Sequence, residues 1–128
     1  MSFENQHVVV IGASSGMGLA TAKAAARSGA KVTVVARSSE ALDRAVNELG
    51  SRSQAFVADI GDERAIESLF DRFEVVDHVV TAAADLTFSP IQQLDGAAAQ
   101  RIVSSKILGP FYAVKHAVPR LSKHGSFA

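Results

Sequence analysis

The stretch that decides the fold is Gly12-Ala13-Ser14-Ser15-Gly16-Met17-Gly18. An apolar run at residues 7–11 comes directly before it, and an alanine-rich segment with helical periodicity at residues 17–28 comes directly after it. A glycine-rich turn between a strand and a helix leaves the N–H groups and the positive dipole end of the helix free to face an anion. We therefore interpret this turn as a phosphate-binding loop; the alternative is an ordinary strand-to-helix turn that happens to be rich in glycine.

Each glycine of this loop has a physical reason to be there. Gly12 lets the chain turn sharply off the strand, Gly16 removes a side chain where a pyrophosphate must approach the backbone, and Gly18 lets the helix lie close to the sheet. Because a strand precedes the loop and a helix follows it, we favour dinucleotide binding over the plain turn. The loop residues expected to contact the cofactor are Gly12, Ser14, Ser15, Gly16, Met17 and Gly18.

The rest of the chain repeats this strand-then-helix order. Apolar runs lie at residues 7–11, 32–36, 55–58 and 78–82, and helical segments at 17–28, 39–49, 63–73 and 97–121. The runs are apolar at consecutive positions, which is typical of parallel strands covered on both faces. We predict an α/β, Rossmann-type, doubly wound parallel sheet with strand order 3-2-1-4. The first two helices should cover one face and the last two the other.

The C-terminal part of the chain gives two further expectations. The last helix should carry an apolar stripe made of Ile102, Val103, Ile107, Phe111, Val114, Val118 and Leu121. Residues 125–128 should be the first residues of a fifth strand, so that the fourth strand has a partner of at most four residues. The chain would then be a single cofactor-binding domain over residues 1–128, truncated at the fifth strand, and we expect it to self-associate as a homo-oligomer.

Composition excludes several classes of function. Thirteen basic side chains balance thirteen acidic ones, which argues against nucleic-acid binding. The chain has no apolar run long enough for a membrane span and no signal peptide at its start. It has no cysteine, and its four histidines lie on different elements, so we expect no metal site. A cytoplasmic location is compatible with this composition.

The spacing Gly-x-x-x-Gly-x-Gly resembles that of the short-chain dehydrogenase/reductase family. The resemblance runs from about residue 6 to residue 128 and includes Asp59, Asp77-His78-Val79-Val80 and Gly109-Pro110-Phe111. It implies a nicotinamide cofactor and the oxidation or reduction of a carbonyl/alcohol pair in a small-molecule substrate.

The end of the second strand bears on the choice of cofactor. An NAD site usually has a carboxylate there to hold the ribose 2′-hydroxyl. This sequence has Ala36-Arg37-Ser38-Ser39 instead. Arg37 can pair with a 2′-phosphate and Ser38 can add a hydroxyl donor, so we favour NADP(H) over NAD(H). The alternative makes Arg37 a solvated loop residue and Ser38 only a helix cap.

The resemblance extends the site to the ends of the third and fourth strands. It implies that Asp59 faces the adenine and that Ile60 packs on the ring, whereas Asp59 could also be a turn residue before the third helix. The family's Asn-Asn-Ala-Gly after the fourth strand is replaced by Thr81-Ala82-Ala83-Ala84. We still place Ala82, Ala83 and Ala84 at the cofactor, with Thr81 taking over part of the lost amide support.

Lys106 stands where the family has an asparagine in the long helix. Its side chain is typical of an ordinary surface lysine. Pro110 lacks an N–H, so the carbonyl of Lys106 loses its helical partner and could hold a water. The resemblance places the family's proton-relay water there.

The family's catalytic Ser and Tyr-x-x-x-Lys are not found in this sequence. The only tyrosine is Tyr112, which Lys115 follows at the wrong spacing. We therefore expect an NADP-dependent oxidoreductase represented by its cofactor-binding half, with residues 1–128 alone inactive. One alternative is a non-catalytic module that binds a dinucleotide or a partner. Another is a nucleotide-sugar or methyl-transfer enzyme on this fold, although the latter usually needs an acid after the second strand.

Overall fold

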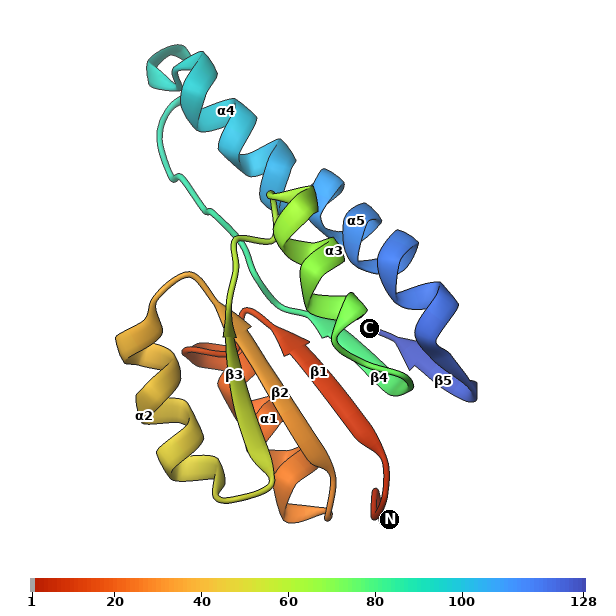
Figure 1. Ribbon diagram of the computed structural model, residues 1–128. Helices are drawn as coiled ribbons and strands as arrows, with labels where there is room; N and C mark the ends of the chain where they lie inside the picture. Colours follow the sequence, from red (N-terminus) through yellow and green to blue (C-terminus); the bar gives the residue numbers. More distant parts are fainter. Residues whose placement is uncertain (1) are drawn as a thin grey trace.

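A five-stranded parallel sheet forms the centre of the chain (Figure 1). The computed structural model describes residues 2–128. Its strands are β1 (His7–Ile11), β2 (Lys31–Ala36), β3 (Ser53–Val57), β4 (Val76–Thr81) and β5 (Leu121–Phe127). They lie in the order β3-β2-β1-β4-β5, which confirms the predicted Rossmann-type sheet and adds β5 beside β4.

Helices cover both faces of this sheet, as the strand pattern predicts. On one face, α1 (Gly16–Arg27) and α2 (Ser39–Leu49) pack over a core that includes Val8 and Val10 of β1. On the other face, α3 (Glu63–Asp71) and α5 (Gly109–Ala117) pack over a core that includes Val9 and Ile11. Alternate residues of β1 thus enter opposite cores, which is why the strand is apolar at every position.

The long helix predicted at residues 97–121 is divided into several segments. After a short 3₁₀ turn, η1 (Ile91–Gln93), the chain forms α4 (Gly96–Val103), the π-helical segment η2 (Ser104–Leu108), α5, and the 3₁₀ turn η3 (Val118–Arg120). The N–H of Gly109 bonds the Ser104 carbonyl five residues back instead of four. Pro110 has no N–H to continue the regular α-helical ladder, so the wider turn accommodates it.

The prediction that Leu121 belongs to this helix is wrong. Leu121 has extended backbone angles and pairs with Val76 as the first residue of β5. Pro119 stops the helix because it cannot donate the next helical hydrogen bond. The expectation of a four-residue strand is also wrong, since β5 has seven residues, with an irregular register between its pairs to Val76 and His78.

The apolar stripe predicted for the long helix does not face the sheet. The buried face of α5 consists of the small residues Gly109, Ala113 and Ala117. The large apolar residues of the stripe are exposed instead, along α4, η2, α5 and η3. Their exposed fractions run from 42% to 63%: Val103, Ile107, Phe111, Val114 and Val118. Small residues let the helix approach the sheet closely. Self-association through the exposed residues stays a prediction.

A buried polar network closes the sheet end opposite to the glycine loop. His7, only 7% exposed, contacts the Thr33 hydroxyl through Nε2 at 2.7 Å and the Val75 carbonyl through Nδ1 at 3.4 Å. The Gln54 amide donates to the same Thr33 oxygen at 2.9 Å. A neutral ring with its proton on Nδ1 satisfies this network, in which the Thr33 hydroxyl donates to Nε2. Burial lowers the pKa of His7 from 6.5, more than the hydrogen bond to Val75 raises it.

This network makes stability depend on pH. The unfolded chain takes up a proton at His7 below pH 6.5, whereas the folded ring resists protonation until a lower pH. We expect the free energy of unfolding to be constant between pH 7.5 and about 6.5. It should fall as the pH drops below 6.5. His7→Gln should reduce this dependence. Denaturant unfolding between pH 7.5 and 4.5 measures this dependence. A hydrogen bond from Lys115 lowers the pKa of Glu63, so protonation of Glu63 reduces the stability only below about pH 4.5. An equally steep fall in the variant would contradict the assignment.

Candidate functional site

A cleft of about 460 Å³ lies at the carboxyl ends of β1, β2 and β4 and extends over the turn after β3. Ligands of open α/β sheets bind at this edge, and the volume suits a small organic ligand. The cleft gathers every residue that the sequence singled out for the cofactor, although their individual roles stay predictions. Those lining residues are Gly12, Ser14, Ser15, Gly16, Met17, Gly18, Arg37, Ser38, Asp59, Ile60, Ala82, Ala83 and Ala84, with Lys106 beside them.

The three glycines of the loop serve different purposes. A Cβ on Gly12, which has a φ of +89°, would overlap the backbone of Ala83, with 2.6 Å to its Cα. A Cβ on Gly18 would overlap the carbonyl oxygen of Gly12. Gly16, with a φ of +57°, has no protein atom within 4 Å of its Cβ position. Two glycines therefore allow close backbone packing, and the third leaves open space at the cleft.

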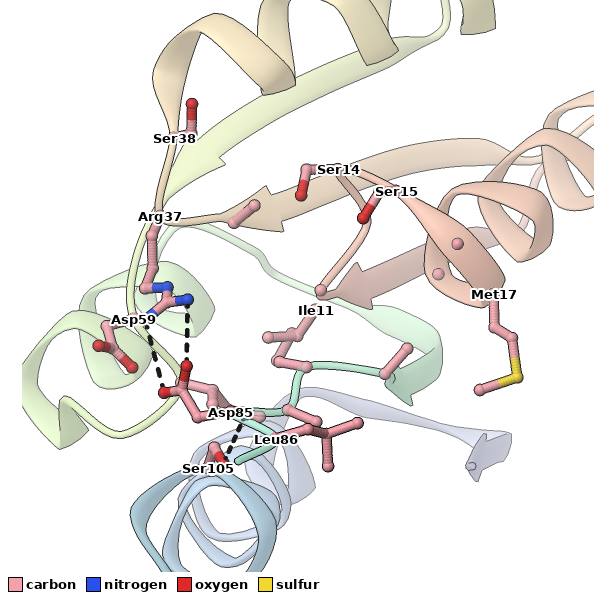
Figure 2. Close-up of a pocket in the computed structure, with 18 of the residues that line it drawn as sticks. Ile11, Ser14, Ser15, Met17, Arg37, Ser38, Asp59, Asp85, Leu86 and Ser105 are labelled. Atoms are coloured by element: carbon pink, nitrogen blue, oxygen red, sulfur yellow. Dashed lines mark hydrogen bonds and ion pairs between the residues drawn. The ribbon is translucent and has the colours of Figure 1, made fainter. Parts of the chain in front are cut away.

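The N-terminus of α1 faces this open space without an internal anion. Ser15 is the N-cap residue, yet its side chain makes no capping hydrogen bond. The first turn of α1 contains no acidic residue. The free N–H groups and dipole of this helix end thus suit the pyrophosphate of a dinucleotide, and the Ser14 and Ser15 side chains lie beside it (Figure 2).

Backbone hydrogen bonds hold the glycine loop in place. The N–H groups of Gly12 and Ala13 donate to the Val35 carbonyl at 2.8 and 3.2 Å, and the Ala82 N–H donates to the Ile11 carbonyl at 2.7 Å. The Thr81 hydroxyl instead donates to the Ala128 carbonyl at 3.4 Å. The expectation that Thr81 takes over the lost amide support is therefore wrong, because the hydroxyl is directed toward the end of β5.

Arg37 and Ser38 lie where β2 gives way to α2. The Ser38 Oγ accepts a hydrogen bond from the Ala41 N–H at 3.3 Å, so it caps the helix while its own O–H can still donate. The Arg37 guanidinium faces the carboxylate of Asp85, with nitrogen–oxygen distances of 3.3 and 3.5 Å (Figure 2). The alternative interpretation of Arg37 as simply solvated is thus incomplete, since it has a partner in the cleft.

Asp59 and Ile60 occupy the turn after β3. Asp59 Oδ1 accepts a hydrogen bond from the Gly61 N–H at 2.8 Å, as expected of a turn aspartate, and the residue also lines the cleft. The Ile60 side chain is only 4% exposed and packs beside Gly109, where a Cβ would come within 2.8 Å of Ile60 Cγ1. An adenine ring could therefore contact only the edge of Ile60.

Lys106 lines the cleft from the π-helical segment, with an exposed side chain. π-Helical turns are frequent at functional sites, and this one includes the residue whose carbonyl loses its partner at Pro110. The role of that carbonyl stays a prediction.

Six lining residues are absent from the predicted site. Ile11, Ala36 and Ala58 lie at the ends of strands, and the other three are Asp85, Leu86 and Ser105. Asp85 and Leu86 follow β4 at the same sheet edge, so the rule that loops after parallel strands line the crevice could have found them. Ser105 gave no local signal, because its hydroxyl reaches the cleft only through the packing of the helix.

Metal sites and membrane-spanning helices are two further features that the structure can contain. Within residues 2–128, no group of three or more His, Asp or Glu side chains is arranged to hold a metal ion. No helix in this described part of the chain has both the length and the apolar character needed to cross a membrane.

Comparisons with known proteins agree with this geometry. The family described as short chain dehydrogenase matches residues 6–126. A cis-4-hydroxycyclohexanecarboxylate dehydrogenase of Sinomonas cyclohexanicum is 34% identical, over 99% of this chain and 54% of the relative. A short-chain type dehydrogenase/reductase from Mycobacterium ulcerans superposes with a TM-score of 0.91 at 29% identity, over 99% of this chain and 51% of that one.

A further solved structure carries a nucleotide. A short chain dehydrogenase of Escherichia coli CFT073, complexed with NADPH, has a TM-score of 0.89 at 25% identity, over 97% of this chain and 57% of that chain. The chain spans about half the length of the relatives it matches. Three curated relatives that are 34% identical to it are covered over 36%, 54% and 68% of their own length.

Proposed function

Because the chain belongs to the short-chain dehydrogenase family, we propose that its cleft binds NADP(H) in preference to NAD(H). We further propose that it serves an oxidoreductase acting on a carbonyl or alcohol group of a small molecule. The observation that carries the cofactor preference is Arg37 at the end of β2, lining the cleft next to Ala36, where an NAD site usually has a carboxylate. The NADPH bound by the Escherichia coli relative supports the same choice.

Different residues of the cleft would bind different parts of the cofactor. The glycine loop and the N-terminus of α1 would hold the pyrophosphate, since this helix end has free N–H groups and no acidic side chain in its first turn. Arg37 and the Ser38 hydroxyl would hold the 2′-phosphate, and Asp59, which lines the same cleft, would face the adenosine. When bound, the nicotinamide supplies the hydride chemistry, for which this chain provides position and electrostatics.

The cofactor preference can be tested at Arg37. We expect NADP(H) to bind at least about 1 kcal/mol more tightly than NAD(H), because one charge-assisted phosphate contact contributes roughly that much. Arg37→Asp should reverse the order, since a carboxylate repels the phosphate and can accept from the ribose hydroxyl. Calorimetric titration of both cofactors measures this. Arg120→Asp is the matched control, because Arg120 pairs with Asp71 at 3.4 Å and does not line the cleft. Equal affinities for the two cofactors in the unaltered chain would contradict the proposal.

The catalytic part of the proposal separates an enzyme from a binding module. Tyr112 is half-buried against the α3/α5 core, and Lys115 donates to Glu63 at 2.6 Å; neither residue lines the cleft. No tyrosine of this chain is therefore placed to protonate a carbonyl oxygen.

We accordingly expect NADPH binding by residues 1–128 without measurable NADPH oxidation in the presence of small ketones or aldehydes. Absorbance at the NADPH band, followed with protein whose mass has been verified, measures the rate. Steady oxidation would show that other residues supply the acid. Retained NADPH binding without turnover is also what a non-catalytic dinucleotide-binding module would show, and activity in a longer form of the protein distinguishes the two.

A further inference from the structure

Arg37 has a competing anion within the cleft. Its Nη2 lies 3.3 Å from Asp85 Oδ1 and its Nη1 lies 3.5 Å from Asp85 Oδ2, so both arms of the guanidinium fork face the carboxylate. This is the arrangement by which arginine binds a carboxylate or a phosphate. The fork that would hold a 2′-phosphate is therefore already directed at an acidic group of the same chain.

The position of Asp85 is fixed by a different element. Its backbone N–H donates to Ser105 Oγ at 3.0 Å (Figure 2). That hydroxyl in turn donates to the Ile102 carbonyl at 3.3 Å. Ser105 is only 4% exposed and belongs to the π-helical segment. A buried hydroxyl thus anchors the backbone at Asp85, and the carboxylate is presented to Arg37 from a fixed point on the opposite wall of the cleft.

The charges near Arg37 strengthen this competition. Asp59 and Asp85 both line the cleft together with Arg37, and all three also line the adjoining hollow next to α4. Asp62 and Arg101 line that hollow as well, so three carboxylates share these surroundings with two guanidinium groups. An entering 2′-phosphate meets an arginine whose charge is already balanced. The side chains of Arg37 and Asp85 are 62% and 31% exposed, so water screens the pair and the exchange of partners is feasible.

We propose that Asp85 is a specificity-determining residue that competes with the 2′-phosphate of NADP(H) for Arg37. Binding NADP(H) exchanges the Asp85 carboxylate for the phosphate, whereas NAD(H) has no phosphate and leaves the pair intact. Asp85 thereby lowers the affinity for NADP(H) selectively and reduces the difference in affinity between NADP(H) and NAD(H). This inference rests on the proposed NADP(H) preference.

The test uses two probes that differ only in the 2′-phosphate: adenosine 2′,5′-bisphosphate and adenosine 5′-monophosphate. Asp85→Asn should tighten binding of the bisphosphate about three- to tenfold, a modest factor because the pair is partly exposed. The affinity for the monophosphate should change by less than about twofold, since that probe has no 2′-phosphate to contact Arg37. The Asp85→Asn variant keeps the backbone N–H that bonds Ser105, so we expect the fold to be retained; Asp85→Ala provides a second variant with the same anchor.

Two further variants isolate the cause. Asp71→Asn removes the same charge from an arginine pair of similar length, at 3.4 Å to Arg120, outside the cleft, and should leave both probes unaffected. In an Arg37→Gln background, Asp85→Asn should lose most of its effect on the bisphosphate, because the competition needs the guanidinium. A positioning role of Asp85 in cleft shape would instead alter both probes in both backgrounds.

The outcomes separate this inference from the function on which it rests. If the unaltered chain prefers the bisphosphate through Arg37 but neither Asp85 variant tightens it, the inference is overturned and the NADP(H) preference stands. If the unaltered chain binds both probes equally, or Arg37→Gln changes nothing, the cofactor preference fails and this inference fails with it.

Discussion

Gly16→Val is expected to abolish detectable binding of NADP(H), a loss of at least about a hundredfold. Gly16 is the first residue of α1, and no protein atom lies within 4 Å of its Cβ position. A branched side chain there enters the space that the pyrophosphate needs and not the protein core. Cofactor affinity is therefore lost while the sheet and both helix layers still form. Titration with NADPH, monitored by fluorescence or calorimetry, measures the loss.

The backbone conformation of Gly16 requires a control. Its φ of +57° lies in the left-handed region, where a side chain costs roughly 1–2 kcal/mol of stability. Gly50, the C-cap of α2, also has a positive φ, of +93°, and open space around it, and it does not line the cleft. Gly50→Ala should destabilise the fold and leave NADPH affinity unchanged. Normal NADPH affinity in a folded Gly16→Val protein would show that the loop does not hold the phosphates.

The sheet was predictable because local pattern and tertiary environment agree. Each residue of β1 is buried, and alternate residues enter the two separate cores. Consecutive apolar positions in short segments are typical of strands covered on both faces. Parallel neighbours and helical crossovers then leave few possible topologies, which is why the strand order followed from the order of elements.

The end of the long helix was not predictable from the same kind of pattern. Leu121 continues the helical spacing of Val114 and Val118, yet it begins β5. An apolar residue at that position fits a helix stripe and a partly buried strand equally well, and only Pro119 indicated a boundary. The exposed stripe has the same origin: periodicity identifies a face of the helix, but the small residues Ala113 and Ala117 form the face that is buried.

The cleft shows the same division between local and long-range information. The glycine loop could be recognised because strand, turn and helix are adjacent in the sequence. Asp85 could not be paired with Arg37, since 48 positions separate them and Asp85 belongs to a stretch after β4 without regular structure. Its anchor, Ser105, comes from a third element. Such a pair depends on how three elements pack, and no sequence spacing encodes it.

Gly18→Val is expected to act mainly on stability, whereas Gly16→Val acts mainly on cofactor affinity. It should reduce the free energy of unfolding by about 3 kcal/mol or more. A Cβ on Gly18 would overlap the carbonyl oxygen of Gly12. Gly12 cannot move aside, because its Cα packs directly against the backbone of Ala83 and leaves no room for a Cβ. In addition, its N–H donates to the Val35 carbonyl at 2.8 Å. The helix must therefore move away from the sheet, at the expense of the α1/α2 core.

Denaturant unfolding with a fitted m-value measures this loss of stability. Since the overlap involves the Cβ itself, Gly18→Ala should already produce most of the loss, whereas Gly16→Ala should lower the stability by no more than the strain of its backbone angle. A Gly18→Ala protein as stable as the unaltered chain would mean that α1 can shift along the sheet without loss of packing. The close contact between Gly12 and Gly18 would then not be what positions the N-terminus of α1 at the cleft.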